Sequence, residues 1–387
     1  MLSEQKPGGP LNVAFLGGGR KSAVGRAHLS AIRMDGRYQL VAGVFSRSWD
    51  ENLATADAYF VDRQRTYPGI AQLIEAERER LDAVIVLTPT PDHEASVVPC
   101  LAARLPVICE KALASTVEGA DHIAEAQRAN RGFLAVTFNY SGYPMVRELR
   151  ALIARGALGR IVHFRAEMPQ EGFIRLLKSG RQPCPQAWRL ADGPIPTIHL
   201  DLGVHLHQLV YYLTREHPLE VIADQKSFGW FPDVIDHVAA LARYTNGIHG
   251  EFGFSKSSLG PRNGLRLQIR GTAAAAEWYQ AAPEEIRVYH VDGRHETLDR
   301  GGPVLEGDRD EYSRFKAGHP AGYVEAFANL YADIGDCLDQ FRATGTWESH
   351  EVFGVDVATE GLTMMQAMVD GAVNKRWTAV SSQKATR

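Results

Sequence analysis

Short, continuously apolar segments alternate with helical segments over the first third of the chain. Polar or glycine residues directly follow these apolar segments. Five of them are expected to form strands: residues 11–16, 38–45, 83–87, 106–109 and 132–137. A run that is apolar at every position is typical of a strand whose two sheet faces are both covered by helices. Strand–helix alternation of this kind predicts a parallel, doubly wound α/β sheet, which binds ligands at the carboxyl ends of its strands.

The chain beyond about residue 140 has a different pattern. Helices are expected over residues 145–155, 323–342 and 351–369. Between the first and second of these lie strand candidates, several of which alternate apolar and polar residues: 161–167, 221–227, 238–244, 249–254 and 265–270. This alternation predicts an α+β domain built on a largely antiparallel open sheet, with one face covered and the other exposed. The predicted division is an α/β domain of the Rossmann type over residues 11–138 and an α+β domain over residues 139–375.

Composition excludes several classes of partner. The 387 residues carry 42 Lys and Arg against 46 Asp and Glu, a formal charge of −4, with no basic run. We therefore expect no binding to nucleic acid or to an anionic membrane. The first ten residues lack the apolar stretch of a signal peptide, and no apolar run is long enough to span a bilayer. The four cysteines lack the spacing of a metal or redox motif, so we expect a cytoplasmic protein with reduced cysteines.

A glycine-rich turn follows the first predicted strand. Gly17, Gly19 and, after a gap of five residues, Gly25 lie between this strand and a helix expected over residues 24–34. Glycine permits a tight turn and lets backbone N–H groups approach a pyrophosphate at a helix N-terminus. The usual fingerprint has only two residues before its third glycine, and the longer loop here adds Arg20 to the candidate cofactor contacts. A tight turn without a ligand is the alternative interpretation.

The end of the second predicted strand indicates which dinucleotide is bound. NAD-binding proteins commonly place a carboxylate there, whereas an arginine accommodates the 2′-phosphate of NADP. This chain has Ser46 and Arg47, with no acid before Asp50. A hydroxyl and a guanidinium bind phosphate and a carboxylate repels it, so this pair favours NADP over NAD. The alternative is that Arg47 is a solvated surface residue.

Several short motifs occur in a fixed order along residues 11–375. They are Thr88-Pro89-Thr90-x-x-His93, Glu110-Lys111-Ala112, Gly142-Tyr143-Pro144, Gly156-Ala157-Leu158-Gly159, Trp188-Arg189, Asp201-Leu202-Gly203-Val204-His205, Gly318-His319-Pro320 and residues 325–331. Together they resemble the glucose–fructose oxidoreductase, inositol dehydrogenase and rhizopine-catabolism family (Gfo/Idh/MocA), in a sugar-dehydrogenase-like branch. The chain departs from the family pattern at Ala112, Thr90 and Gln208, where the family usually has a proline, an asparagine and an acid.

The resemblance implies an NAD(P)-dependent oxidoreductase that acts on a sugar or cyclitol. It implies that residues 11–138 are the dinucleotide-binding Rossmann domain and that residues 139–375 are the substrate, catalytic and oligomerisation domain. It implies that His205 is the general acid/base, that Asp201 is its partner or a substrate ligand, and that Lys111 stabilises the reacting oxygen. From the residues alone, Asp201 and His205 are four positions apart, so on a helix the carboxylate can orient the imidazole. A helix-capping aspartate and a packed core histidine are the alternative, and Lys111 is equally compatible with a solvated loop lysine.

The other candidates follow from their positions in these motifs and at predicted strand ends. Candidate cofactor contacts are Thr88, Pro89, His93, Glu110 and Asn139. Candidate substrate contacts, besides Lys111, Asp201 and His205, are Tyr140, Trp188, Arg189, His199 and His319. Ordinary packing or surface exposure explains Asn139 and these five residues equally well, and His207 is interpreted as structural. Because HExxH and GxSxG are absent, we expect neither a catalytic metal nor a serine hydrolase.

With the glycine-rich turn, the resemblance implies hydride transfer between a nicotinamide dinucleotide, NADP or NAD, and a hydroxyl or keto carbon of a sugar or cyclitol. The family resemblance also implies a homodimer or homotetramer. Two other functions remain open. One is a glycoside-cleaving enzyme that uses a tightly bound nicotinamide transiently, and the other is a non-catalytic dinucleotide-binding sensor.

Overall fold

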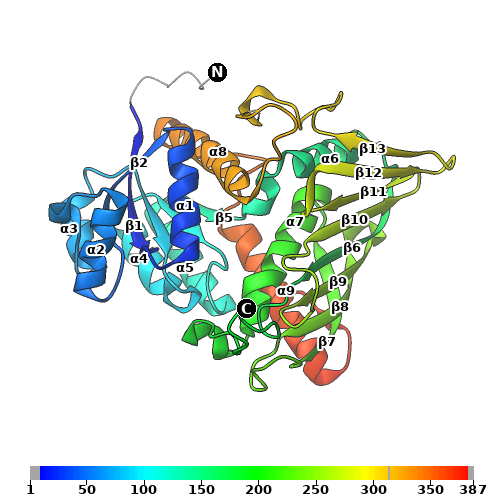
Figure 1. Cartoon of the computed structure of the whole chain (residues 1–387), viewed down its shortest axis with the longest axis horizontal. Helices are drawn as coiled ribbons and strands as arrows, with labels where there is room; N and C mark the ends of the chain where they lie inside the picture. Colours follow the sequence, from blue (N-terminus) through cyan, green and yellow to red (C-terminus); the bar gives the residue numbers. More distant parts are fainter. Residues whose placement is uncertain (1–8, 313, 382–387) are drawn as a thin grey trace. The chain divides into compact units, whose positions relative to one another are not determined.

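The computed structural model describes residues 9–312 and 314–381. These residues form two compact units, each built from two segments of the chain. The first unit contains the described residues up to Gly142 together with Gly322–Thr359, and the second contains Tyr143–Ala321 and the described residues from Glu360 onward. In Figure 1 the first unit is mostly blue, cyan and orange, and the second is mostly green, yellow and red.

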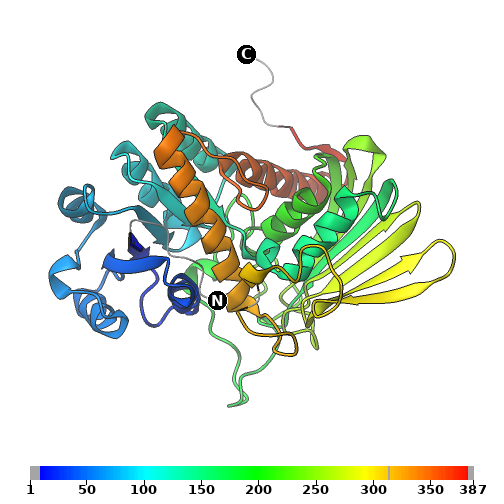
Figure 2. The ribbon, with the colours of Figure 1, turned by 90° about the horizontal axis from the view of Figure 1, so that it is seen from above.

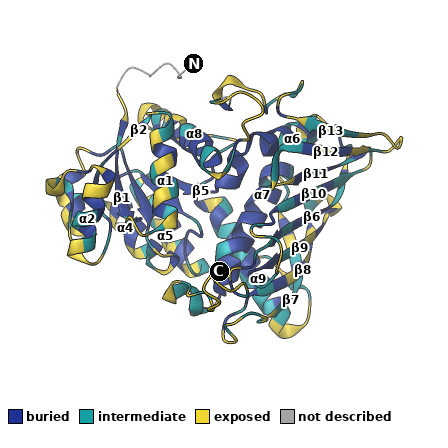
Figure 3. Cartoon of the chain, viewed as in Figure 1, coloured by how far each residue is buried: buried dark blue, intermediate teal, exposed yellow. Residues whose placement is uncertain are grey.

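A five-stranded sheet forms the centre of the first unit. All its neighbouring strands are parallel, in the order β2-β1-β3-β4-β5. The strands are β1 (Leu11–Gly17), β2 (Tyr38–Val44), β3 (Ala83–Leu87), β4 (Val107–Glu110) and β5 (Leu134–Thr137). Every residue of β3, β4 and β5 is buried, and Figure 3 shows strands of this sheet in dark blue. The predicted parallel, doubly wound sheet is confirmed, and burial on both faces explains its continuous apolar runs.

Six α-helices belong to the described part of the first unit. They are α1 (Ala23–Met34), α2 (Trp49–Tyr59), α3 (Ile70–Glu77), α4 (His93–Ala102), α5 (Val117–Asn130) and α8 (Tyr323–Thr344). Helix α8 packs against α1, where the ring of Phe327 lies 4.6 Å from that of His28. The hydroxyl of Tyr38 also donates to the backbone oxygen of Tyr331 at 2.7 Å. Residues 322–359 therefore complete the core of the first unit, whereas the sequence-based division included them in residues 139–375.

A nine-stranded sheet forms the second unit, in the order β13-β12-β11-β10-β6-β9-β8-β7-β14. Its strands are β6 (Ile161–Pro169), β7 (Pro218–Lys226), β8 (His237–Tyr244), β9 (His249–Ser255), β10 (Arg266–Gly271), β11 (Ala274–Tyr279), β12 (Ala282–His290), β13 (His295–Asp299) and β14 (Thr378–Ala379). Among these described strands, β6 and β9 pair in parallel and the other neighbours are antiparallel. The predicted largely antiparallel sheet is confirmed.

Helices cover one face of this second sheet (Figure 2). They are α6 (Pro144–Ala154), α7 (Val204–Thr214) and α9 (Val355–Asn374). Strand β8 alternates between the two environments, since Leu241 is 50% exposed and Ala242 is 1% exposed. The other sheet face is therefore open, as the alternating pattern predicted. No helix among the described residues has the length and hydropathy needed to cross a bilayer.

Four strands of the second sheet were missed by the sequence prediction: β11, β12, β13 and β14. Strand β11 begins with three alanines, which have low strand propensity. Strand β12 begins Ala-Pro-Glu-Glu, a sequence typical of a loop. These segments become strands because each pairs with a neighbour, as in the register of Ala276 opposite Val288. Tertiary pairing therefore outweighed the local preference.

Candidate active site

The glycine-rich turn brings the end of β1 close to the start of α1. Gly17 and Gly18 have φ values of +80° and +67°, a region that favours glycine. A Cβ added at Gly17 would lie 2.7 Å from the carbonyl oxygen of Leu87, and one at Gly25 would collide with the carbonyl oxygen of Gly18. The hydroxyl of Ser22 caps the helix by accepting a hydrogen bond from Gly25 N at 3.1 Å. The glycines therefore allow close packing between the turn and the helix.

The basic side chains beside this turn already have carboxylate partners. Arg20 Nε lies 2.9 Å and Lys21 Nζ 2.8 Å from carboxylate oxygens of Glu51 on α2. Hydrogen bonds from Lys21 and then Arg20 hold the pKa of Glu51 below its usual range. Arg47, whose side chain is 89% exposed, pairs with Asp92 at 2.6 Å. Two cations thus share one acid, and the third pairs with a different acid.

The turns after β3 and β4 are joined by His93. Its Nδ1 lies 2.7 Å from the carbonyl oxygen of Ala112, and its Nε2 lies 2.9 Å from that of Thr88. Burial lowers the pKa of His93. The peptide between Lys111 and Ala112, where the family usually has a proline, is cis. The candidate Pro89 directly precedes the short 3-10 helix Thr90–Asp92. Because His93 contacts both Thr88 and Ala112, the motifs after β3 and β4 lie against each other.

Glu110 belongs to a buried network at the end of β4. Its Oε1 accepts a hydrogen bond from Thr137 Oγ1 at 2.6 Å and lies 3.1 Å from His28 Nε2. The other ring nitrogen of His28 lies 2.7 Å from the hydroxyl of Tyr331 on α8. Burial acts to raise the pKa of Glu110, but hydrogen bonds from His28 and Thr137 and the charge of Lys111 lower it to about 2. This network connects β4 with α1, β5 and α8, and the sequence prediction did not identify His28 or Tyr331 as parts of it.

The 3-10 helix Asn139–Gly142 follows β5 and holds two further candidates. Tyr140 is 5% exposed, and its ring lies 6.4 Å from that of Tyr323. Asn139 is 2% exposed. Its buried Nδ2 has no hydrogen-bond partner within residues 9–312 and 314–381. A buried donor without a partner is unfavourable, so this amide is suited to a bound acceptor at the end of β5.

In the second unit, Asp201 lies on the π-helical segment His199–Gly203, and His205 lies in the first turn of α7. Asp201 Oδ2 accepts hydrogen bonds from both Lys256 Nζ and Arg189 Nη1. Lys256 directly follows β9, is only 4% exposed, and has its Nζ 4.8 Å from the ring centre of Phe173. His205 is 5% exposed. The structure therefore places two cations on the carboxylate that the motif identified.

Lys256 was missed by the sequence prediction. It follows a predicted strand, and polar residues at strand ends were the signal used for the first sheet. The same signal applied to residues 249–254 would have selected it.

The remaining predicted residues of the second unit divide into two groups. Trp188 stacks under Arg189, with the guanidinium carbon 4.4 Å from the ring centre, so these two residues and Asp201 lie together. His199 is fully buried, with its Nε2 3.0 Å from Gln225 Oε1, and burial lowers its pKa to about 4. His319 is exposed, and its backbone oxygen accepts from Arg300 at 3.4 Å. The structure thus gives His199 and His319 contacts outside the group around Asp201.

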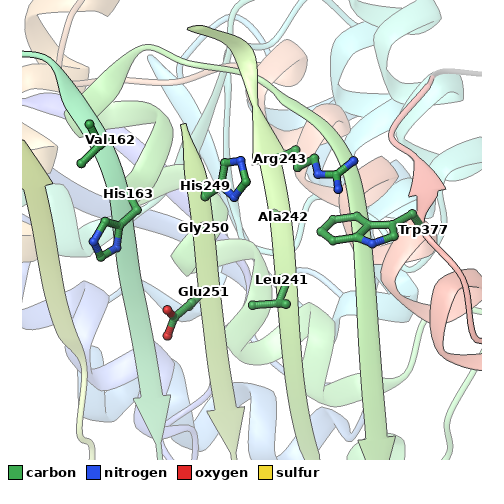
Figure 4. Close-up of a pocket in the computed structure, with 9 residues that line it drawn as sticks. All are labelled: Val162, His163, Leu241, Ala242, Arg243, His249, Gly250, Glu251 and Trp377. Carbon is green, nitrogen blue, oxygen red and sulfur yellow. The ribbon is translucent and has the colours of Figure 1, made fainter. Parts of the chain in front are cut away.

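A hollow of about 530 Å³ lies on the open face of the second sheet (Figure 4). His163, His249 and Glu251 line it, and Arg243 stacks over Trp377 at its edge, 4.4 Å from the ring centre. None of the predicted site residues lines this hollow. Across the described chain, no group of three or more His, Cys, Asp or Glu side chains is arranged to hold a metal ion.

Comparison with known proteins shows the family. Residues 11–138 match the family model described as "Oxidoreductase family, NAD-binding Rossmann fold", and residues 146–277 match "GFO/IDH/MocA C-terminal domain". The uncharacterized oxidoreductase YfiI of Bacillus subtilis is 30% identical over 382 residues, which cover 94% of this chain and 95% of that protein. The chain belongs to the Gfo/Idh/MocA family of oxidoreductases.

Two relatives named for inositol dehydrogenase activity are similar to part or nearly all of the chain. Inositol 2-dehydrogenase of Acidothermus cellulolyticus is 30% identical over 173 residues, 43% of this chain and 46% of that protein. An inositol dehydrogenase homolog from Azotobacter vinelandii, solved with NADH and myo-inositol, has a TM-score of 0.86 at 28% identity. That match covers 96% of this chain and 98% of the other. The protein is therefore an NAD(P)-dependent oxidoreductase with an NAD-binding Rossmann domain.

The first unit of this oxidoreductase fits a bound dinucleotide. The close packing that requires Gly17 and Gly25 leaves the N-terminus of α1, the positive end of the helix dipole, at the carboxyl end of β1. Asn139 adds the buried amide donor at the end of β5. These features match what a pyrophosphate and a polar ring substituent need from a protein.

Proposed function

We propose that this oxidoreductase transfers a hydride between a nicotinamide dinucleotide and a hydroxyl or keto carbon of a sugar or cyclitol. The observation that carries the proposal is the whole-chain similarity to the inositol dehydrogenase homolog solved with NADH and myo-inositol. The Asp201–His205 segment supports it, because oxidation of an alcohol needs a group that accepts the hydroxyl proton. The bound nicotinamide would supply the hydride acceptor or donor.

In the proposed mechanism His205 is the general acid/base. It takes the proton of the substrate hydroxyl during oxidation and returns it during reduction. Asp201 is its partner or a ligand of the substrate, and this carboxylate accepts hydrogen bonds from Arg189 and Lys256. Lys111, at the carboxyl end of β4, is proposed to stabilise negative charge on the reacting oxygen.

We also propose that NADP is preferred to NAD. Ser46 and Arg47 follow β2, where a carboxylate would repel the 2′-phosphate. Arg47 is exposed and paired with a single carboxylate, Asp92, for which a phosphate can substitute. Arg20 is a further candidate contact, paired with Glu51.

The test is absorbance at the reduced-nicotinamide band. The purified protein is mixed with NADP or NAD, separately, and with each member of a panel of monosaccharides, anhydro sugars and inositols. We expect reduction with at least one polyol, and a faster rate with NADP. No absorbance change across the panel, together with tight dinucleotide binding, would contradict the proposal and favour transient redox chemistry or a sensor.

A further inference from the structure

Lys111 lies between two anchored neighbours at the carboxyl end of β4. On one side of it, Glu110 is 8% exposed and is held by the buried network at the end of this strand. On the other side, Ala112 is 1% exposed, and its carbonyl oxygen lies 2.7 Å from Nδ1 of His93. Side chains from other elements therefore hold the backbone both before and after the lysine.

His93 faces a backbone acceptor on each side of its ring. It is the first residue of α4 and is only 1% exposed. Its Nδ1 faces the carbonyl oxygen of Ala112, and its Nε2 lies 2.9 Å from that of Thr88, in the turn after β3. A neutral imidazole donates through one nitrogen and an imidazolium through both, so in either form each N–H has a carbonyl partner. Both ring nitrogens are thus directed at the backbone and not at a bound molecule.

The starting point of the Lys111 side chain matters for the proposed chemistry. Charge on a reacting oxygen is stabilised by a donor only when the donor is already in the right place. A misplacement of about 1 Å, even one caused away from the reacting atoms, can cost roughly 10²-fold in rate. The four-carbon stem of a lysine is flexible, so the backbone that carries it has to be fixed.

We propose that His93 is a positioning residue for Lys111. It clamps the carbonyl oxygen of Ala112 to the turn after β3 and so determines where the neighbouring ammonium lies. This inference rests on the proposed function, in which Lys111 stabilises the reacting oxygen. The sequence made His93 a candidate cofactor contact, whereas its two carbonyl contacts give the histidine of this motif a role that acts through the backbone.

Two variants separate this role from ordinary packing. His93→Phe keeps a planar ring of similar size and removes both ring nitrogens. Ser96→Ala is the matched control, because it lies on the same helix, is 2% exposed, and loses a hydrogen bond of 2.8 Å to the carbonyl oxygen of Asp92. The control therefore removes a buried hydrogen bond from α4 and keeps the two contacts of His93.

The first measurement is the rate at which acetic anhydride acetylates Lys111, followed by mass spectrometry. Lys178, an exposed lysine of the same molecule, is the internal reference. The ratio of the two rates should rise at least about 3-fold in His93→Phe, because the loss of a hydrogen bond frees the backbone that carries Lys111. It should stay unchanged in Ser96→Ala. An unchanged ratio in His93→Phe, or an equal rise in both variants, would overturn the proposal.

The second measurement is a double-mutant cycle on kcat, with a polyol and a dinucleotide that give turnover. Lys111→Met should lower kcat roughly 10²-fold, the usual loss for one donor to developing charge. His93→Phe should lower it about 10-fold. If His93 acts through Lys111, the double variant should be no slower than Lys111→Met, whereas a loss of about 10³-fold would overturn the positioning role.

Failure of the proposed function gives a different result. Full turnover by Lys111→Met, or no reduced nicotinamide with any polyol, would contradict the function assigned to the lysine. The acetylation ratio does not depend on turnover, so a rise confined to His93→Phe would still show that His93 holds Lys111 in place.

Discussion

Two carboxylates, one in each unit, are held in contrasting ways. Glu110 is contacted by His28 and Thr137, and the network closes on the Tyr331 hydroxyl in the core of the first unit. Asp201 is held by two permanent cations, one of which is partly exposed and has unused donors. A closed network of this kind stabilises the fold, whereas a partly exposed guanidinium with unused donors can still bind another molecule. The comparison suggests that fold stability depends on Glu110 and ligand recognition on the group around Asp201.

The largest expected effect tests whether the second unit carries the chemistry. His205→Asn should lower kcat by roughly 10²- to 10⁴-fold, the usual contribution of a general acid/base. The Kd for the dinucleotide should be unchanged, because the glycine-rich turn lies in the first unit. Steady-state rates and fluorescence titration measure the two quantities. His163→Ala, on the open sheet face, is the control and should retain full activity. Full turnover by His205→Asn would remove the catalytic assignment.

The next effect tests Glu110 as a stabilising group. Its pKa is lowered in the folded protein, so its contribution is present above the unfolded pKa of about 4.5 and is lost as pH falls towards 2. Glu110→Gln should therefore lower the free energy of unfolding by roughly 3 kcal/mol at pH 7. Urea unfolding at pH 7, 4 and 3 should show the difference from the native protein shrinking at the lower values. The exposed pair of Asp57 with Arg63 gives the control, and Asp57→Asn should have a much smaller effect. A pH-independent difference would contradict this role.

A smaller loss is expected when the Asp201 cluster is broken. Lys256→Met leaves Arg189 on the carboxylate, so the charge does not become unpaired. We expect a loss of about 2 kcal/mol, below the range for a buried charge left without a partner. Urea unfolding measures it, with Lys178→Met, an exposed lysine, as the control. A loss greater than that of Glu110→Gln would invert the comparison, because Asp201 would then be the more important structural group.

The smallest effect concerns cofactor choice in the first unit. Arg47→Ser should reduce the ratio of NADP to NAD affinity about 10-fold, or about 1.4 kcal/mol, by removing one charge-assisted contact with the 2′-phosphate. Fluorescence titration with both reduced cofactors gives the ratio. Arg63→Ala, which removes another exposed ion-paired arginine, should leave it unchanged. An unchanged ratio in Arg47→Ser would identify Arg47 as a solvated surface residue.

The sequence predicted the first sheet to within two residues at each strand end, because burial on both faces leaves an unambiguous apolar run. It did not predict that α8 completes that unit. Periodicity identifies the apolar face of residues 323–342, but the partner, α1, lies about 290 residues earlier in the chain. Sequence spacing carries no signal for such a long-range contact.

The sequence identified the motifs of the candidate site, but it did not identify Lys256 as a partner of Asp201. The Asp201–His205 spacing and the Trp188–Arg189 pair are local patterns. The salt bridge from Lys256 depends on a strand end and a π-helical segment that meet only after folding, 55 positions apart. A lysine followed by serines reads as a solvated loop, whereas Phe173 and Asp201 bury it. The pairing of Lys256 with Asp201 could therefore be found only in the folded structure.

Residues 322–359 return to the first unit late in the sequence, which affects how this unit folds during synthesis. Ribosomal synthesis usually lets an N-terminal domain fold before the rest of the chain emerges. Here the dinucleotide-binding unit lacks α8 until residue 344 has left the ribosome, when most of the chain has already been translated. The core residues of α1 that pack on α8 lack this partner until then. A stop codon before the codon for Tyr323 would therefore leave the core of the N-terminal unit incomplete.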